Sequence, residues 1–419
     1  MKLHIENIMA IGSADIDLDG ITVIVGNNNT GKSTAGKVLW TMFHALSGLN
    51  EKIYNERVEG CVRAIRLKTS GRSFFSHGYS IRKHALDYAR QLVNKTLSVD
   101  QLMDKLQQEY EEYLFQDNFS PDWDALKKGL QEILAIQDNE LRKQVVLTEF
   151  EKGLGKQFVP LFKEHGTPSV FMTIKGKQMG VRFTNNQPEI ELQLDLQNNA
   201  YYFDNPSLLE DTPFDNLYSE ERDRIVESFM KGGEIVEDIL LRKRYEVIGA
   251  QLASILNGEI KYDKDNQDFC LESSKYTDLL LFSSLSQGVK SMATLQAAFS
   301  RGAVGEKDVL ILDEPEIHLH PEWQVKYAEL IVQLQKAFDL TVLLTSHSPD
   351  FVEAIRLYSQ KYGSEEKLNG YISAVSTDND TVTIQKIAAD DWDVIFDKFA
   401  RSVDMLIELR SEMEGKSDE

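Results

Sequence analysis

Short apolar runs of strand length recur along the chain, and each is followed by polar residues. The runs are ITVIV at 21–25, VLIL at 309–312 and TVLLT at 341–345. Continuous runs of aliphatic and β-branched residues are typical of strands buried on both faces of a parallel sheet. Ligands of such sheets gather at the carboxyl ends of the strands. We therefore predict an α/β fold with a mainly parallel sheet and a functional site where these runs end.

Stretches with helical or alternating spacing separate the apolar runs. Residues 51–166 place apolar residues at helical spacing, as in QLMDKLQQEYEEYL, and predict a helical insertion. Residues 167–214 contain the alternating segments VFMTIKG, MGVRFTN and EIELQLDL, which predict antiparallel strands. Residues 215–419 contain helical patterns and the two later apolar runs. We expect one domain, formed by 1–50, 167–214 and 215–419, that the insertion interrupts.

The last helical pattern of the chain begins near residue 390. Its apolar positions share one helical face and predict docking on the domain or on a partner; they are Trp392, Ile395, Phe399, Val403 and Leu406.

Composition and charge narrow the class of protein. Of the 419 residues, 42% are hydrophobic and 27% charged, as in folded soluble proteins. The 46 basic and 67 acidic residues give a net charge of −21, so any nucleic-acid contact must be local. Cys61 and Cys270 lack the spacing of a zinc site or a disulfide framework. With no membrane-length apolar run and no signal-peptide organisation in MKLHIENIMAIG, we expect a cytoplasmic protein without membrane contact.

The first apolar run leads directly into GNNNTGKST, which fits the P-loop pattern GxxxxGK(S/T). Its glycines let backbone amides turn toward phosphate oxygens, and the following helix adds its positive N-terminal dipole. Lys32 should reach the β- and γ-phosphates, and the Ser33 hydroxyl suits Mg²⁺. The alternative is a Gly/Asn-rich turn that only resembles the motif. The candidate phosphate-binding residues are Gly26, Asn27, Asn28, Asn29, Thr30, Gly31, Lys32, Ser33 and Thr34.

The second and third apolar runs end in carboxylates and a histidine. VLILDE at 309–314 fits a Walker B motif, in which Asp313 would hold Mg²⁺ through water. Glu314 is placed to accept the proton of an attacking water. The run TVLLT is followed by Ser346 and His347, and His347 would face the γ-phosphate as a sensor. Taken alone, a histidine such as His347 favours a structural role; its place after the acidic strand reverses that preference in favour of the sensor.

Two further histidines, His318 and His320, follow the acidic motif in EPEIHLHPEW. Alternate residues of an extended segment can converge on one metal ion. No Cys or third His accompanies them, so a loop that packs at a subunit boundary is the better interpretation.

A serine-glycine helix start lies in FSSLSQGVKSMATLQAAF, where Ser286, Gln287 and Gly288 precede a helical pattern. Ser286 could simply cap this helix. The order of the motifs, however, resembles that of ABC-type ATPases: P-loop, serine-glycine signature, acidic strand, strand ending in His. That resemblance implies ATP and Mg²⁺ as ligands, and a homodimer or higher even-numbered oligomer in which Ser286, Gln287 and Gly288 contact ATP on a second subunit. The segment LSQGV at 285–289 departs from the transporter signature LSGGQ.

A narrower resemblance covers about two thirds of the chain. The opening, with two short strands before the P-loop, looks like that of SMC, RecF and OLD-type ATPases. Four segments together resemble the ATPase subunit of Septu antiphage systems, which also occurs beside some retrons. They are SLSQGVKSM, LILDEPEIHLHPEWQVKYAELIVQL, LLTSHSPDFVEAI and YYFDNP. This resemblance implies a separate nuclease partner of HNH type and, in retron versions, a reverse transcriptase with its RNA-DNA product. The competing reading is a RecF/SMC-like DNA repair or chromosome-maintenance clamp.

One local segment opposes the overall charge. Residues 61–95 carry eight basic side chains against one acid, Asp87, with aromatic residues interleaved. They could bind nucleic acid or a partner, or form a solvated helical face paired with acidic neighbours. Arg72 and His77, in RSFFSH, superficially resemble the RxxxxH motif of HEPN ribonucleases. The residues after His347 lack a TOPRIM-type acidic constellation, so we expect no nuclease activity in this chain.

Overall fold

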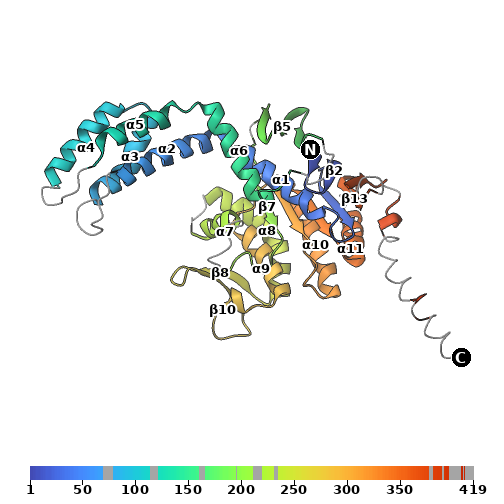
Figure 1. The fold of residues 1–419 in the computed structure, drawn as a ribbon. Helices are drawn as coiled ribbons and strands as arrows, with labels where there is room; N and C mark the ends of the chain where they lie inside the picture. Colours follow the sequence, from blue (N-terminus) through green and yellow to red (C-terminus); the bar gives the residue numbers. More distant parts are fainter. Residues whose placement is uncertain are drawn as a thin grey trace, which may run out of the picture. The chain divides into compact units, whose positions relative to one another are not determined.

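The chain folds into two compact units (Figure 1). The computed structural model describes residues 1–68, 79–113, 121–159, 166–194, 196–210, 219–230, 235–376, 381–388 and 391–395, together with 407, 408 and 410. One unit contains Met1–Ser47 and Glu149–Glu419, and the other contains Gly48–Thr148.

The smaller unit is helical, as the spacing of apolar residues predicts. It contains α2 (Leu49–Lys68), α3 (Tyr79–Val93), α4 (Val99–Tyr113), α5 (Trp123–Ala135) and most of α6 (Asp138–Leu154). Buried side chains such as Ile65, Leu102 and Leu130 form its core. Asp122 caps α5, where its carboxylate accepts from the backbone N–H of Ala125 at 2.9 Å.

Eleven strands of the described residues form a sheet at the centre of the larger unit, in the order β6-β5-β4-β1-β2-β14-β13-β3-β12-β11-β7. Its strands are β1 (Lys2–Ile8), β2 (Ile11–Asp17), β3 (Ile21–Gly26), β4 (Ser169–Ile174), β5 (Lys177–Thr184), β6 (Gln187–Leu192), β7 (Ala200–Phe203), β11 (Val309–Asp313), β12 (Thr341–Ser346), β13 (Leu368–Val375) and β14 (Val382–Lys386). The strands predicted at 21–25, 309–312 and 341–345 and the alternating strands after 167 are therefore confirmed.

The two halves of this sheet differ in strand direction. From β13 through β3, β12 and β11 to β7, all neighbours are parallel. From β6 to β2 they are antiparallel. The α/β fold class is confirmed, and the antiparallel part continues the parallel sheet. Because β3, β11 and β12 run in one direction, their carboxyl ends meet at one edge.

Helices cover the parallel half because its strands are apolar on both faces. These helices are α1 (Lys32–Leu46), α7 (Ser219–Met230), α8 (Ile235–Leu256), α9 (Gln287–Ser300), α10 (Pro321–Phe338) and α11 (Pro349–Lys361). Helix α1 packs on β7, β11 and β12, and Figure 1 shows α10 beside α11. The resulting core joins side chains of β3, β11 and β12 to those of α9, α10 and α11.

A second, three-stranded antiparallel sheet lies between α8 and α9 in sequence. It consists of β8 (Glu259–Asp263), β9 (Asp268–Glu272) and β10 (Leu280–Leu281), and the short helix η1 (Phe282–Ser284) follows it. A further short helix, η2 (Glu365–Lys367), precedes β13. Within the described part of the chain, no helix has the length and apolar character needed to cross a membrane.

The predicted C-terminal helix can be followed only at its start. Trp392 and Ile395 are buried in the core of the larger unit. The other positions of its apolar face lie outside the described residues; they are Phe399, Val403 and Leu406.

Candidate functional site

The P-loop connects β3 to α1 and is shaped by two glycines. A Cβ atom on Gly26 would lie 2.5 Å from the carbonyl oxygen of Ser373, so only glycine fits there. Gly31 has φ 76° and precedes the first residue of α1. Ser373, on β13, also donates from its hydroxyl to the carbonyl oxygen of Thr30. The strand next to β3 thus braces the loop, a contact that the sequence pattern does not reveal.

The asparagines of the P-loop are exposed to solvent, whereas its lysine is buried. Asn27, Asn28 and Asn29 are exposed, and Ser33 and Thr34 are partly exposed. Lys32 is only 4% exposed, and its Nζ donates to the carbonyl oxygen of Asn27 at 2.8 Å. Thr30 Oγ1 donates to the same oxygen at 2.8 Å.

Electrostatics around Lys32 involve opposing effects. Desolvation by burial lowers the pKa of Lys32, while the charges of Glu314, Asp313 and Glu316 act to raise it. Lys32 Nζ lies 3.9 Å from Glu314 Oε1. A buried cation that faces carboxylates is suited to bind an anion together with a divalent cation.

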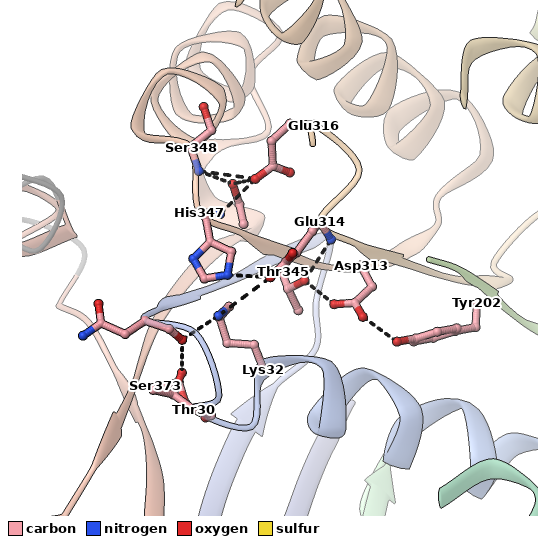
Figure 2. Close-up of polar contacts among 12 residues, drawn as sticks. Thr30, Lys32, Tyr202, Asp313, Glu314, Glu316, Thr345, His347, Ser348 and Ser373 are labelled. Atoms are coloured by element: carbon pink, nitrogen blue, oxygen red, sulfur yellow. Dashed lines mark hydrogen bonds and ion pairs between the residues drawn. The ribbon is translucent and has the colours of Figure 1, made fainter. Parts of the chain in front are cut away.

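Asp313 is the last residue of β11 and Glu314 follows it, and both make hydrogen bonds with the Thr345 hydroxyl group (Figure 2). Asp313 Oδ2 accepts from the Tyr202 hydroxyl at 2.7 Å, and Oδ1 accepts from Thr345 Oγ1 at 2.5 Å. The same Thr345 Oγ1 accepts from the backbone N–H of Glu314 at 3.0 Å. Tyr202 and Thr345 were not identified from the sequence. Register explains the second contact, because Asp313 on β11 pairs with Thr345 on β12.

Glu314 and His347 meet at the carboxyl ends of β11 and β12. Glu314 has φ 50°, a left-handed conformation that is uncommon for a residue with a side chain and that turns the chain away from the strand. His347 Nε2 lies 2.5 Å from Glu314 Oε1 (Figure 2). The structure therefore brings together the residues predicted from all three apolar runs: Lys32, Asp313, Glu314 and His347.

Ser286, Gln287 and Gly288 stand at the start of α9. Ser286 occupies the N-cap position, yet its hydroxyl makes no capping hydrogen bond; Ser286 and Gln287 are exposed. Gly288 packs on the segment after β11, since a Cβ atom there would lie 2.9 Å from the carbonyl oxygen of His318. Ser286 therefore occupies the N-cap position through its backbone, but its side chain does not cap the helix.

The two histidines after the acidic motif have different surroundings. His320 is the N-cap of α10, and its Nδ1 accepts from the backbone N–H of Glu322 at 3.4 Å. His318 lines a small cavity of about 60 Å³ together with Asp204, Ser291 and other residues. Among the residues that the structure describes, no group of three or more His, Cys, Asp or Glu side chains could hold a metal.

The basic segment 61–95 is described only in part. Arg72, Phe74, Phe75 and His77 lie outside the described residues. Arg63 is exposed and pairs with Glu59 at 3.3 Å and with Glu56 at 3.9 Å. The Tyr88 hydroxyl donates to Glu109, and its ring packs against the core of the helical unit. In the described part, these contacts match the solvated helical face with acidic partners that was the alternative interpretation.

Three solved structures to which the chain is similar are SMC heads. A Smc head bound to the C-terminal winged-helix domain of ScpA is 12% identical, with 92% of this chain and 97% of that chain covered and a TM-score of 0.39. The SMC head domain from Thermotoga maritima is 10% identical, with 92% and 98% covered and a TM-score of 0.37. A Smc head with an extended coiled coil, bound to the C-terminal domain of ScpA and derived from Pyrococcus furiosus, is 11% identical, with 98% of both chains covered and a TM-score of 0.40.

Comparison with protein families covers most of the chain, although no curated protein matches it. Residues 211–353 match the family "AAA domain, putative AbiEii toxin, Type IV TA system". Residues 1–227, more than half of the 419, match the family "AAA ATPase domain". The chain therefore belongs to the AAA ATPase domain family and is an ATP-binding protein of the P-loop ATPase type.

Proposed function

We propose that this chain is the ATP-hydrolysing subunit of a bacterial antiphage defence complex of the Septu or retron-associated type. In this complex, head-to-tail dimers that enclose ATP control a separate nuclease. The observation that carries the catalytic part is the meeting of Lys32, Glu314 and His347, with Glu314 Oε1 3.9 Å from Lys32 Nζ and 2.5 Å from His347 Nε2.

Each residue of the site has a role that its chemistry supports. Lys32 and the amides of the P-loop bind the phosphates. Ser33 and Asp313 offer the hydroxyl and carboxylate oxygens that Mg²⁺ prefers, and the ion would neutralise phosphate charge. Glu314 accepts the proton of the attacking water. His347 holds the Glu314 carboxylate by a hydrogen bond and senses the γ-phosphate.

Dimer formation is supported by the surface around the start of α9. The Ser286 hydroxyl is exposed and makes no capping bond, so it is available to a phosphate oxygen of a second copy. Large apolar side chains beside it in sequence are exposed, with Tyr276 at 56% and Leu281 at 51%. Ile317, in the segment against which α9 packs, is 58% exposed. Exposed apolar side chains close to an incomplete site favour coverage by a partner.

The defence role is supported by two observations on overlapping segments of the chain. The motifs of residues 282–355 resemble the Septu ATPase subunit, and the family matched by residues 211–353 is described as a putative toxin of a TA system. The implied partners are a nuclease of HNH type and, in a retron setting, a reverse transcriptase with its RNA-DNA product. A RecF/SMC-like repair clamp is the alternative function.

Turnover of two variants tests the catalytic assignment. Glu314→Gln should bind ATP within about threefold of the parent affinity and hydrolyse it about 100-fold more slowly, because the amide cannot accept a proton. Lys32→Ala should lose most nucleotide affinity. Steady-state phosphate release and the binding of a fluorescent ATP analogue measure both effects.

Two matched variants serve as controls for this test. Glu322→Gln, at an exposed position of α10, and Lys37→Ala, one turn further along α1, should behave like the parent. Parent-like turnover by Glu314→Gln would exclude it as the base, and retained affinity in Lys32→Ala would argue against the P-loop assignment.

Native mass spectrometry tests the assembly. Glu314→Gln, purified with the products of neighbouring genes, should form an even-numbered oligomer with a nuclease or reverse transcriptase only when ATP and Mg²⁺ are present. A bare ATP-dependent dimer that gains only DNA would support the repair clamp.

A further inference from the structure

The buried carboxylate of Glu316 lies two residues after Glu314 and contacts the segment that carries His347. We define residues 346–348 as the switch loop. Glu316 Oε1 accepts from Ser346 Oγ at 2.6 Å, from the backbone N–H of His347 at 2.9 Å and from that of Ser348 at 3.3 Å (Figure 2). One oxygen atom thus accepts hydrogen bonds from three consecutive residues of the switch loop.

Burial of the Glu316 carboxylate has an unfavourable effect on the free energy of folding. The residue is 2% exposed, and burial raises the pKa of its carboxyl group, although the hydrogen bonds from Ser346 and His347 act to lower it. Its other oxygen, Oε2, is buried and has no hydrogen-bond partner within the described structure. A buried carboxylate without full satisfaction destabilises a fold. The position of Glu316 beside the site is better explained by the three hydrogen bonds that Oε1 accepts from the switch loop.

A second set of contacts joins the same two segments. The Gln324 side-chain amide donates to the carbonyl oxygen of Leu319 at 3.1 Å and to that of Glu316 at 3.4 Å. Gln324 Oε1 accepts from Ser348 Oγ at 2.7 Å. The segment after β11 and the switch loop after β12 therefore form one hydrogen-bonded network, with Glu316 at its buried end.

We propose that Glu316 is the positioning residue of the switch loop, which fixes the backbone of His347 so that its imidazole meets Glu314 Oε1. This inference rests on the proposed ATPase function. Glu316 acts through three hydrogen-bond donors of the switch loop. Without this acceptor, His347 would be free to move away from Glu314. Residues 26–34, which bind the phosphates in our proposal, take no part in these three hydrogen bonds.

Two substitutions separate this role from a general structural one. Glu316→Ala removes the acceptor and should lower kcat about tenfold or more, with the Kd for ATP within about twofold of the parent. Glu316→Gln keeps a carbonyl oxygen that can accept from the same donors and should restore kcat to within about fivefold of the parent. Glu322→Ala is the matched control, because Glu322 is an exposed carboxylate in the first turn of α10. It should leave kcat and the Kd for ATP unchanged.

Hydrogen exchange gives a readout that needs no turnover. In Glu316→Ala, peptides that cover residues 346–348 should exchange faster than in the parent, while peptides of the P-loop remain unchanged. Parent-like exchange and kcat in Glu316→Ala would overturn the inference, as would equal losses of kcat in Glu316→Ala and Glu316→Gln. If the parent itself hydrolyses no ATP, the proposed function fails, and the exchange experiment still tests the loop contacts.

Discussion

Thr345 illustrates how much a single hydroxyl group organises in this site. Its Oγ1 donates to Asp313 and accepts from the backbone N–H of Glu314, at 2.5 and 3.0 Å. The hydroxyl therefore orients the proposed Mg²⁺ ligand and the proposed base at the same time. Groups that orient ligands in this way usually affect activity strongly although they touch no substrate.

We expect Thr345→Val to lower kcat about tenfold, because valine has a similar shape and removes both hydrogen bonds. The loss should occur with little change in thermal stability. Measurement of kcat and of the melting temperature checks this expectation, with Thr341→Val on the same strand as the control. Unchanged turnover in Thr345→Val would show that Tyr202 alone is enough to orient Asp313.

At the scale of elements, the start of α9 and the segment after β11 form one packed contact. Gly288 allows it, since a Cβ atom there would lie 2.9 Å from a backbone carbonyl oxygen of His318 and 3.2 Å from Leu319 Cδ2. A backbone atom cannot move aside as the end of a flexible side chain can. The proposed trans-acting Ser286 and the acidic segment are thereby held together.

Gly288→Ala should destabilise the larger unit by about 1–3 kcal/mol through overpacking. The gain in helix propensity, about 0.5–1 kcal/mol, is too small to compensate. Chemical denaturation measures the difference. Gly305→Ala, whose added methyl group would meet Asp308 Oδ2 at an ordinary 3.5 Å, is the control and should change stability little. A stabilised Gly288→Ala variant would contradict the tight contact.

The whole molecule consists of a nucleotide-binding unit that a helical unit interrupts. The core of Gly48–Thr148 is formed by its own helices, and all residues of the candidate site belong to the other unit. With a net charge of −21, any nucleic-acid contact of the chain must be confined to a local patch. Because the site residues all lie in the other unit, we expect the helical unit to be dispensable for ATP binding.

Replacement of residues 48–148 by a flexible linker of about ten residues should therefore leave the Kd for ATP within about threefold of that of the parent. Calorimetric titration with ATP checks this, and the same deletion combined with Lys32→Ala is the control for specific binding. A folded deletion variant that no longer binds ATP would show that the helical unit contributes to the nucleotide site.

Local rules explain why the main residues of the candidate site could be predicted from the sequence. The P-loop is visible because its glycines and lysine have a set spacing, and the strands that end at Gly26, Asp313 and Ser346 are visible as aliphatic runs. Because parallel strands end at one edge, the sequence also predicts that Lys32, Asp313, Glu314 and His347 gather there.

The neighbours that hold these residues in place depend on the packed fold. Tyr202 and Asp313 are 111 residues apart, and Ser373 and Thr30 are 343 residues apart. Their contacts arise from the strand order, which places β7 beside β11 and β13 beside β3. In the same way, Thr345 meets Asp313 through strand register, and Glu316 reaches the switch loop through a turn after β11. Periodicity reports which face of an element is buried; register and strand order depend on the packing of the whole sheet, which no local pattern encodes.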